Sequence, residues 1–303
     1  MILFHFPSHE TMAQQLLPLC PFQGGRFAVN RFPNQELYIT ISGPVSGEHC
    51  LILGSITPPD EQLFSVMLLA HTLKKEGARK VTALLPYLAY SRHDKDKPGE
   101  SLTVAWVGSL FQSSGIDEVI TVDLHSQRDR EFFPVSVTSI PTTKLFAEAI
   151  QKHGLKDATL VAPDNGAINR CRDVKAAANM PGELVTFEKQ RTLHGITHLA
   201  SKGAVGPRAV VIDDMLDTGG TLISACEELA RQGAMEIYIM VTHGLFTGPH
   251  WKKLLSLRVK TLFCTDTIAL RKELASESIV TLSVIPLLQT QLQEAVGYDQ
   301  GTH

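Results

Sequence analysis

The stretch that decides the fold is Val210-Val211-Ile212-Asp213-Asp214-Met215-Leu216-Asp217-Thr218-Gly219-Gly220-Thr221, an apolar run that ends in two carboxylates and a loop of small residues. The apolar run predicts a buried strand of a parallel sheet, and such sheets bind ligands at the carboxyl ends of their strands. A helix predicted over residues 222–232 would present its positive end at the same edge. The stretch therefore predicts an α/β domain with a ligand site at this loop.

The residue types of the loop fit a phosphorylated sugar. Asp213 and Asp214 can accept hydrogen bonds from the two hydroxyls of a ribose. Glycine lets the backbone approach an anion closely, and Thr218 and Thr221 add hydroxyl donors at the start of the helix. A turn in which Thr221 merely caps the helix would leave the acids unexplained. The predicted sugar-phosphate residues are Asp213, Asp214, Asp217, Thr218, Gly219, Gly220 and Thr221.

The composition is that of an ordinary globular protein. Of 303 residues, 44% are apolar and 19% charged, and the formal net charge is -3, which gives no electrostatic case for nucleic acid or an anionic membrane as a partner. No apolar run reaches the roughly 20 residues that span a bilayer, and the first residues lack a signal-peptide pattern, so we expect a cytoplasmic protein. The five cysteines form no C-x-x-C pair, which predicts core residues and argues against disulfides or a zinc site.

A helix, a glycine and a strand occur together twice in the chain. Leu73-Lys74-Lys75-Glu76-Gly77-Ala78 precedes the apolar run 81–85, and Leu229-Ala230-Arg231-Gln232-Gly233-Ala234 precedes the run 237–241. Each glycine can end its helix in the left-handed conformation. A chance match of a common unit is the alternative. The repeat predicts two duplicated domains, residues 1–143 and 144–303, of which only the second has the sugar-phosphate loop.

The loop resembles the phosphoribosyl-diphosphate loop of the type I phosphoribosyltransferase fold, which transferases share with the synthetase of the activated sugar. Further motifs, in order along nearly the full length, are similar to the ribose-phosphate diphosphokinase family. They are Arg31-Phe32-Pro33-Asn34-Gln35-Glu36, residues 86–95, Thr121-Val122-Asp123-Leu124-His125, residues 162–170, Lys189-Gln190-Arg191 and residues 242–248. The resemblance implies an α/β fold of two type I phosphoribosyltransferase-like domains, each a mainly parallel sheet flanked by helices.

The resemblance also implies roles for individual residues. His125 would hold the Mg²⁺ bound to the phosphates of ATP, and Asp164 would hold a second ion near the ribose. Lys189 would stabilise the transition state and Arg191 would position the phosphates, from a polar segment over residues 188–198 that we interpret as a mobile loop. A structural histidine and a solvated charge pair are the alternatives. The implied ATP residues are Phe32, Asn34, Gln35, Glu36, Arg92, His93 and Asp94.

The implied reaction moves the β,γ-diphosphate of ATP to the anomeric hydroxyl of ribose 5-phosphate and releases AMP, in a homo-oligomer whose ATP site is shared between subunits. A diphosphokinase for another ribosyl acceptor and a non-catalytic, synthetase-associated regulatory subunit are the alternatives. The short segment around Gly99-Glu100, with His93 where regulated relatives have glutamine, resembles the archaeal-type subclass and implies activity without inorganic phosphate. Ala167 replaces a glycine common in the family, which weakens the motif around Asp164.

Overall fold

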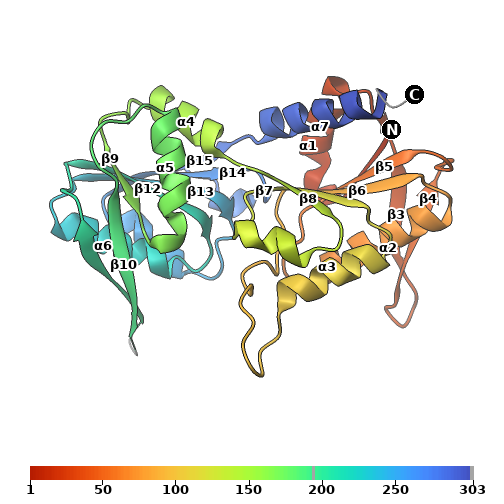
Figure 1. The fold of residues 1–303 in the computed structure, drawn as a ribbon, viewed down its shortest axis with the longest axis horizontal. Helices are drawn as coiled ribbons and strands as arrows, with labels where there is room; N and C mark the ends of the chain where they lie inside the picture. The colour runs from red at the N-terminus through yellow and green to blue at the C-terminus, as the bar shows by residue number, and fades with distance from the viewer. Residues whose placement is uncertain (193–194, 301–303) are drawn as a thin grey trace. The chain divides into compact units, whose positions relative to one another are not determined.

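The structure is a computed structural model (Figure 1) that describes residues 1–192 and 195–300, without the side chains of residue 127 and of residues 188–202 and 295–300. The chain divides into two compact units. Unit 1 comprises Met1–Ile140 and Ile285–His303, and unit 2 comprises Pro141–Val284.

Unit 1 is built on a parallel sheet with the strand order β2-β1-β5-β6-β7-β8. Every residue of β5 is buried, as expected for a central strand with helices on both faces. The strands are β1 (Ile2–His5), β2 (Gln23–Gly24), β5 (His49–Leu53), β6 (Lys80–Leu85), β7 (Glu118–Val122) and β8 (Ser136–Ile140). The helices are α1 (Glu10–Leu16), α2 (Glu61–Lys75), α3 (Thr103–Ser113) and α7 (Ile285–Gln300). A separate antiparallel ribbon is formed by β3 (Arg26–Arg31) and β4 (Leu37–Ser42).

Unit 2 has a larger sheet with the strand order β11-β10-β9-β12-β13-β14-β15. All neighbours are parallel except β10 and β11, which form an antiparallel pair. The strands are β9 (Thr159–Ala162), β10 (Val185–Thr192), β11 (Gly195–Lys202), β12 (Arg208–Leu216), β13 (Glu236–Gly244), β14 (Val259–Thr265) and β15 (Ile279–Leu282). The helices are α4 (Thr143–Lys152), α5 (Ile168–Ala177) and α6 (Gly220–Arg231).

The core of unit 2 lies on both faces of its sheet, because successive residues of a strand point to opposite faces. Ala209 and Val211 of β12 join the cluster that α6 covers. Val210 and Ile212 join the cluster formed with α4 and α5. The apolar run at the start of the deciding stretch is therefore buried on both sides, which confirms it as a central strand.

The two sheets share one topological plan. In unit 1, β1 is followed across the sheet by β5, β6, β7 and β8, and in unit 2, β9 is followed by β12, β13, β14 and β15. The prediction of mainly parallel sheets flanked by helices is confirmed. The common order agrees with the repeated helix-glycine-strand pattern, since α2 and β6 in unit 1 correspond to α6 and β13 in unit 2.

The last helix, α7, goes with unit 1, although the predicted range 144–303 grouped it with the second half. It packs against α1 and β8, and its residues Leu288 and Leu292 are buried. An amphipathic pattern shows that a helix has a partner but does not say which sheet provides it. All five cysteines are buried free thiols, as predicted for core residues. Among the described residues, no helix is both long and apolar enough to cross a membrane.

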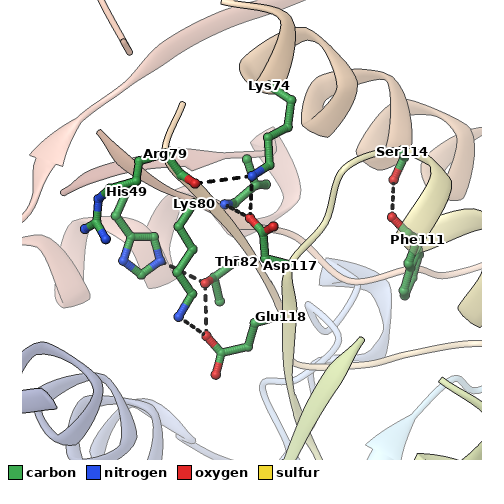
Figure 2. Close-up of polar contacts among 10 residues, drawn as sticks. His49, Lys74, Arg79, Lys80, Thr82, Phe111, Ser114, Asp117 and Glu118 are labelled. Carbon is green, nitrogen blue, oxygen red and sulfur yellow. Dashed lines mark hydrogen bonds and ion pairs between the residues drawn. The ribbon is translucent and has the colours of Figure 1, made fainter. Parts of the chain in front are cut away.

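Polar contacts join β5, β6 and β7 at the amino-terminal edge of the unit 1 sheet (Figure 2). The Thr82 hydroxyl donates to Glu118 Oε2 at 3.2 Å and lies 2.8 Å from His49 Nε2. Lys80 pairs with the same Glu118 oxygen at 2.7 Å. Since the Thr82 hydrogen goes to the carboxylate, the hydrogen between His49 and Thr82 must come from the imidazole. The first residues of these three strands are thus linked to one another by polar contacts.

Candidate active site

The acid pair lies near the carboxyl end of β12. Asp213 and Asp214 are 9% and 6% exposed, and Asp213 Oδ1 accepts a hydrogen bond from the Asp214 amide at 2.9 Å. Burial raises the pKa of Asp213 well above its usual range, and the carboxylates of Asp214 and Asp164 raise it further, whereas Arg170 opposes them. This corner of unit 2 therefore places buried carboxyl groups near one another, and sugar hydroxyls or a cation bound there would favour their ionised form.

The helix after the acids begins inside the predicted phosphate loop. α6 starts at Gly220, two residues before the predicted start. Its N-cap is Gly219, which has a φ of 88° and no side chain to accept from the first N–H groups. Thr218 is exposed, and Asp217 and Thr221 are half-buried. Backbone N–H groups, hydroxyls and the positive end of a helix thus meet at one loop, which is a suitable environment for a phosphate group.

Asp164 lies at the same edge of the unit 2 sheet. It follows β9, whose Val161 pairs with Val211 of β12. Its Oδ1 accepts from the amides of Gly166 at 3.0 Å and Ala167 at 3.3 Å, as the N-cap of the short helix η4 (Asn165–Ala167). Ala167 is itself 1% exposed and packs in the core. The methyl group that departs from the family pattern is therefore accommodated in the core.

The segment with Lys189 and Arg191 is a strand, which corrects the predicted loop over residues 188–198. β10 and β11 form a ribbon in which Lys189 pairs with His198 and Arg191 with Ile196. Only Val185 and Thr186 pair with β9, so β10 continues beyond that strand, as Figure 1 shows. Positions 189 and 191 share one face of the ribbon. Residues 193–194 at its turn, and the side chains of Lys189 and Arg191, lie outside the described residues.

In unit 1, the first predicted ATP segment is the turn between β3 and β4. The Phe32 amide donates to the Glu36 carbonyl at 2.9 Å, and the Glu36 amide donates to Asn34 Oδ1 at 3.2 Å. Gln35 has a φ of 72°, and its carbonyl accepts from Arg31 at 2.6 Å. Phe32 is 50% exposed, and its ring lies against that of Tyr38 at 4.5 Å. The turn is thus closed by its own hydrogen bonds, and it carries one aromatic side chain that is half exposed.

The second predicted ATP segment makes polar contacts within its own loop. His93 Nδ1 donates to the Ser101 carbonyl, and His93 Nε2 lies 3.1 Å from Glu100 Oε2. Lys97 pairs with the same carboxylate at 3.1 Å and lowers its pKa. Arg92 is exposed and Asp94 half-exposed. In this conformation His93 therefore shapes the loop with both ring nitrogens, whereas Arg92 projects to the surface.

His125 follows β7 on a loop that several backbone contacts define. The Leu124 amide donates to Ser139 Oγ at 3.0 Å. After the exposed His125, Ser126 and Asp129 form a capping box: the Arg128 amide donates to Ser126 Oγ, and the Ser126 amide donates to Asp129 Oδ2, both at 3.2 Å. The loop that presents His125 is thus held on both sides of the histidine.

Asp129 is a residue that the sequence interpretation missed. It is fully buried, and burial raises its pKa to about 6, with Asp94 raising it and the Ser126 amide and His125 lowering it. Both Asp94 and His125 therefore lie within electrostatic range of Asp129. The signal was the spacing of Ser126 and Asp129, which is a capping-box pattern directly after the predicted metal residue.

A metal site is not preassembled in the part of the chain that the structure describes, since no three His, Cys, Asp or Glu side chains are grouped there. The donor chemistry nevertheless fits a hard cation at the acids of unit 2, because carboxylate oxygens are the ligands that such ions prefer; burial, and after it the neighbouring carboxylates, raise the pKa of Asp213. A groove of ≈ 410 Å³ in unit 1, between β4 and the end of α2, is lined by none of the predicted residues.

Comparison with known families covers most of the chain. The sequence model of the N-terminal domain of ribose phosphate pyrophosphokinase matches residues 1–115. The model of the phosphoribosyl synthetase-associated domain matches residues 162–296. The first match includes both predicted ATP segments, and the second includes the acid pair, the phosphate loop and the β10–β11 ribbon.

Individual relatives extend over nearly the full length. A ribose-phosphate pyrophosphokinase of Bacillus caldolyticus is 30% identical over 290 residues, which cover 94% of this chain and 91% of the relative. Ribose-phosphate pyrophosphokinase 1 of Streptococcus pyogenes is 29% identical over 294 residues. The crystal structure of phosphoribosylpyrophosphate synthetase from Mycobacterium smegmatis superposes with a TM-score of 0.89 at 24% identity, over 98% of this chain and 99% of that one. The whole fold therefore matches.

Proposed function

The chain belongs to the ribose-phosphate pyrophosphokinase family, and we propose that it transfers the β,γ-diphosphate of ATP to the anomeric hydroxyl of ribose 5-phosphate. The products are AMP and 5-phosphoribosyl 1-diphosphate. The observation that carries this proposal is the loop after β12, where a buried acid pair directly precedes a helix that starts at a glycine N-cap. This arrangement matches a ligand with hydroxyls at one end and a phosphate at the other.

The loop of unit 2 holds ribose 5-phosphate. Asp213 and Asp214 accept hydrogen bonds from the sugar hydroxyls, which relieves the repulsion between the buried carboxylates. The phosphate is bound by the amides at the start of α6, with hydroxyls from Thr218 and Thr221. A terminal phosphate monoester is favoured over a diester, because it has more charge and needs less room at the helix start.

The chemical step displaces AMP from the β-phosphorus, so negative charge grows on the oxygens around that atom. Lys189 and Arg191 supply positive charge from the ribbon that extends beyond β9, with Lys189 stabilising the transition state and Arg191 positioning the phosphates. Asp164 and His125 are the residues that would hold Mg²⁺; the carboxylate is an ordinary ligand for this ion, and the histidine an unusual one. Bound Mg²⁺ would neutralise charge on the phosphate oxygens.

ATP is bound through the two segments of unit 1. The exposed ring of Phe32 offers an apolar face to the purine, and Asn34, Gln35 and Glu36 offer hydrogen bonds to its edge. The remaining ATP residues, Arg92, His93 and Asp94, contact the phosphates or the base. We further propose that the β3–β4 turn serves the ATP site of a second subunit, so that the active species is a homo-oligomer. We place it in the cytoplasm, where its five free thiols would remain reduced.

The test is to incubate the purified protein with ATP, Mg²⁺ and ribose 5-phosphate and to follow AMP and 5-phosphoribosyl 1-diphosphate together. Equal formation of both products supports diphosphate transfer. ADP in place of AMP, or no turnover, would contradict it. Sedimentation at assay concentration tests the oligomer, which a fully active monomer would exclude.

The same assay tests regulation. We propose that turnover needs no inorganic phosphate, because the loop around Gly99-Glu100 is short and its His93 is bound to Glu100 and Ser101 within the loop. A turnover rate that is the same with and without added phosphate is expected. Strong, saturable activation by phosphate would place the chain outside the archaeal-type subclass.

A further inference from the structure

The segment after β13 forms a backbone clamp on the sugar-phosphate loop. β12 and β13 pair up to Leu216 and Gly244, and the hydrogen bonds then continue beyond the strands. The amides of Leu245 and Phe246 both donate to the Leu216 carbonyl, at 2.9 and 3.1 Å, and the Thr247 amide donates to the Asp217 carbonyl at 3.1 Å. The segment after β13 therefore holds the backbone of the loop between the acid pair and Gly219 through these three hydrogen bonds.

Aromatic packing supports the same loop. Phe246 and Trp251 are 1% and 3% exposed, and their rings meet edge to face at 4.9 Å. Gly219 lies directly against Trp251, because a Cβ atom at position 219 would be 2.9 Å from the Trp251 Cα. Phe246 itself has a φ of 52°, a left-handed conformation that is uncommon for an aromatic residue. Such a conformation persists where surrounding contacts impose it.

One charged side chain holds that conformation. Arg271 Nη2 donates to the Phe246 carbonyl at 2.9 Å, and the next amide along the chain, that of Thr247, is the one bound to Asp217. The neighbouring acid, Glu273, lies 3.9 Å from the guanidinium, so the carbonyl is the nearer partner. Arg271 is thus linked to the loop backbone through a single peptide unit.

We propose that Arg271 is a positioning residue for ribose 5-phosphate: through Phe246 and Trp251 it holds residues 216–219 in the conformation that binds the phosphate. The inference rests on the proposed function of the loop and identifies what fixes its geometry. A positioning role predicts weaker binding of ribose 5-phosphate with little change in the binding of ATP or in the turnover number, because the chemical groups themselves remain.

The test compares Arg271→Ala and Arg271→Lys with Arg258→Ala. Arg258 is a matched control, since it donates to the Ala234 carbonyl at 2.6 Å in the same unit, at the amino end of β14. The chain has two tryptophans, and a Trp106→Phe background leaves Trp251 as a fluorescent reporter beside Gly219. Ribose 5-phosphate is added in increasing concentration and its binding is measured by the change in Trp251 fluorescence. Unphosphorylated ribose is the reference ligand. Amide hydrogen exchange over residues 245–247 is measured in parallel.

For Arg271→Ala we expect the dissociation constant and KM for ribose 5-phosphate to rise about three- to tenfold, as for the loss of one ordinary hydrogen bond, because Arg271 is an exposed side chain. The KM for ATP and kcat should stay within about twofold, exchange over 245–247 should accelerate, and Arg271→Lys should restore part of the affinity. Arg258→Ala should behave as wild type. Unchanged ribose 5-phosphate affinity in Arg271→Ala, or an equal loss in Arg258→Ala, would overturn the inference. A wild-type protein that binds no ribose 5-phosphate would instead overturn the proposed function.

Discussion

The two sheets have the same strand order but differ in the loop that follows the corresponding strand. In unit 1, residues 54–60 connect β5 to α2, and Ser55 is 2% exposed. Its hydroxyl accepts from the Tyr87 amide at 3.1 Å and lies 3.0 Å from His9 Nε2. In unit 2, residues 217–219 connect β12 to α6, and the helix starts at a glycine.

The two loops differ in how they are bonded and in how they end, since only the unit 2 loop leads into a helix with a glycine N-cap. In unit 1 the Ile56 amide donates to the Tyr87 carbonyl, and the Ala89 amide donates to the Ile56 carbonyl. In unit 2 the carbonyls of Leu216 and Asp217 accept hydrogen bonds from amides of the segment after β13. The amides at the start of α6 face the loop. One architecture thus carries two differently built loops, and it is in such loops that proteins with a common sheet differ in function.

The two units also differ in the strand beside the first strand of the common order. This difference leads to the mutation with the largest expected effect on activity. Beside β1, unit 1 has only the two-residue strand β2, whereas beside β9, unit 2 has the eight-residue β10 with Lys189. We expect Lys189→Ala to reduce kcat by a factor on the order of 10³, as for loss of a group that stabilises transition-state charge, without a change in thermal unfolding. Lys202→Ala, at the base of the same ribbon, is the control. A Lys189→Ala enzyme with wild-type kcat would exclude the assigned role.

Gly219 offers the next largest effect. Gly219→Ala would place a Cβ atom 2.9 Å from the Trp251 Cα at a positive φ, so the loop must move and ribose 5-phosphate affinity should fall at least about tenfold, with a stability cost of about 1–3 kcal/mol. Gly233, beyond the other end of α6, also has a positive φ but would meet nothing within 4 Å. Gly233→Ala should therefore cost stability alone. Titration of both variants with ribose 5-phosphate separates the two effects.

Sequence reasoning succeeded where chemistry and strand pattern coincide. The run before Asp213 is apolar on both faces, so a buried strand with acids near its end followed from local residues alone. It failed for β10, because residues 186–192 contain one apolar side chain, Phe187, and such a stretch has no hydrophobic face to identify. The partner of β10 is β11, and a ribbon stabilised by backbone pairing leaves little hydrophobic pattern.

Two other features depend on tertiary contacts that a sequence does not contain. The position of α7 with unit 1 depends on where Leu288 and Leu292 find an apolar surface. The clamp on the phosphate loop depends on backbone carbonyls, which every residue has. The motif over residues 242–248 could therefore be recognised without its contacts being known. Arg271, more than twenty residues further on, carries no local signal of its role.

Asp213 connects the chemistry of the unit 2 loop to stability. Its pKa is raised well above the usual value by burial and by Asp214, so the folded state prefers the protonated form. The associated stability is present below the pKa of the unfolded chain and is lost as pH rises towards the folded pKa. Asp213→Asn should remove this loss, so the variant should be more stable than wild type at pH 7.5 and bind ribose 5-phosphate less tightly. Urea unfolding at pH 4 and pH 7.5 checks the sign, and a wild-type pH dependence in the variant would contradict it.

Asp129 in unit 1 should also make the protein less stable as pH rises, by a smaller amount than Asp213. Burial raises its pKa from 3.8 to about 6, so its stability contribution should be lost between roughly pH 4 and pH 6. Asp129→Asn keeps an oxygen that can accept from the Ser126 amide and removes the buried charge. We expect the variant to equal wild type at pH 4 and to be about 1–2 kcal/mol more stable at pH 7.5. The fluorescence of Trp106 reports this unfolding in a Trp251→Phe background. Trp106 lies on α3, and this helix packs against η3 (Gln127–Phe132). Ser126→Ala removes only the other half of the capping box and should lower stability equally at both pH values. If Asp129→Asn did the same, the carboxyl would act solely as a cap, and the buried charge would be peculiar to the unit 2 loop.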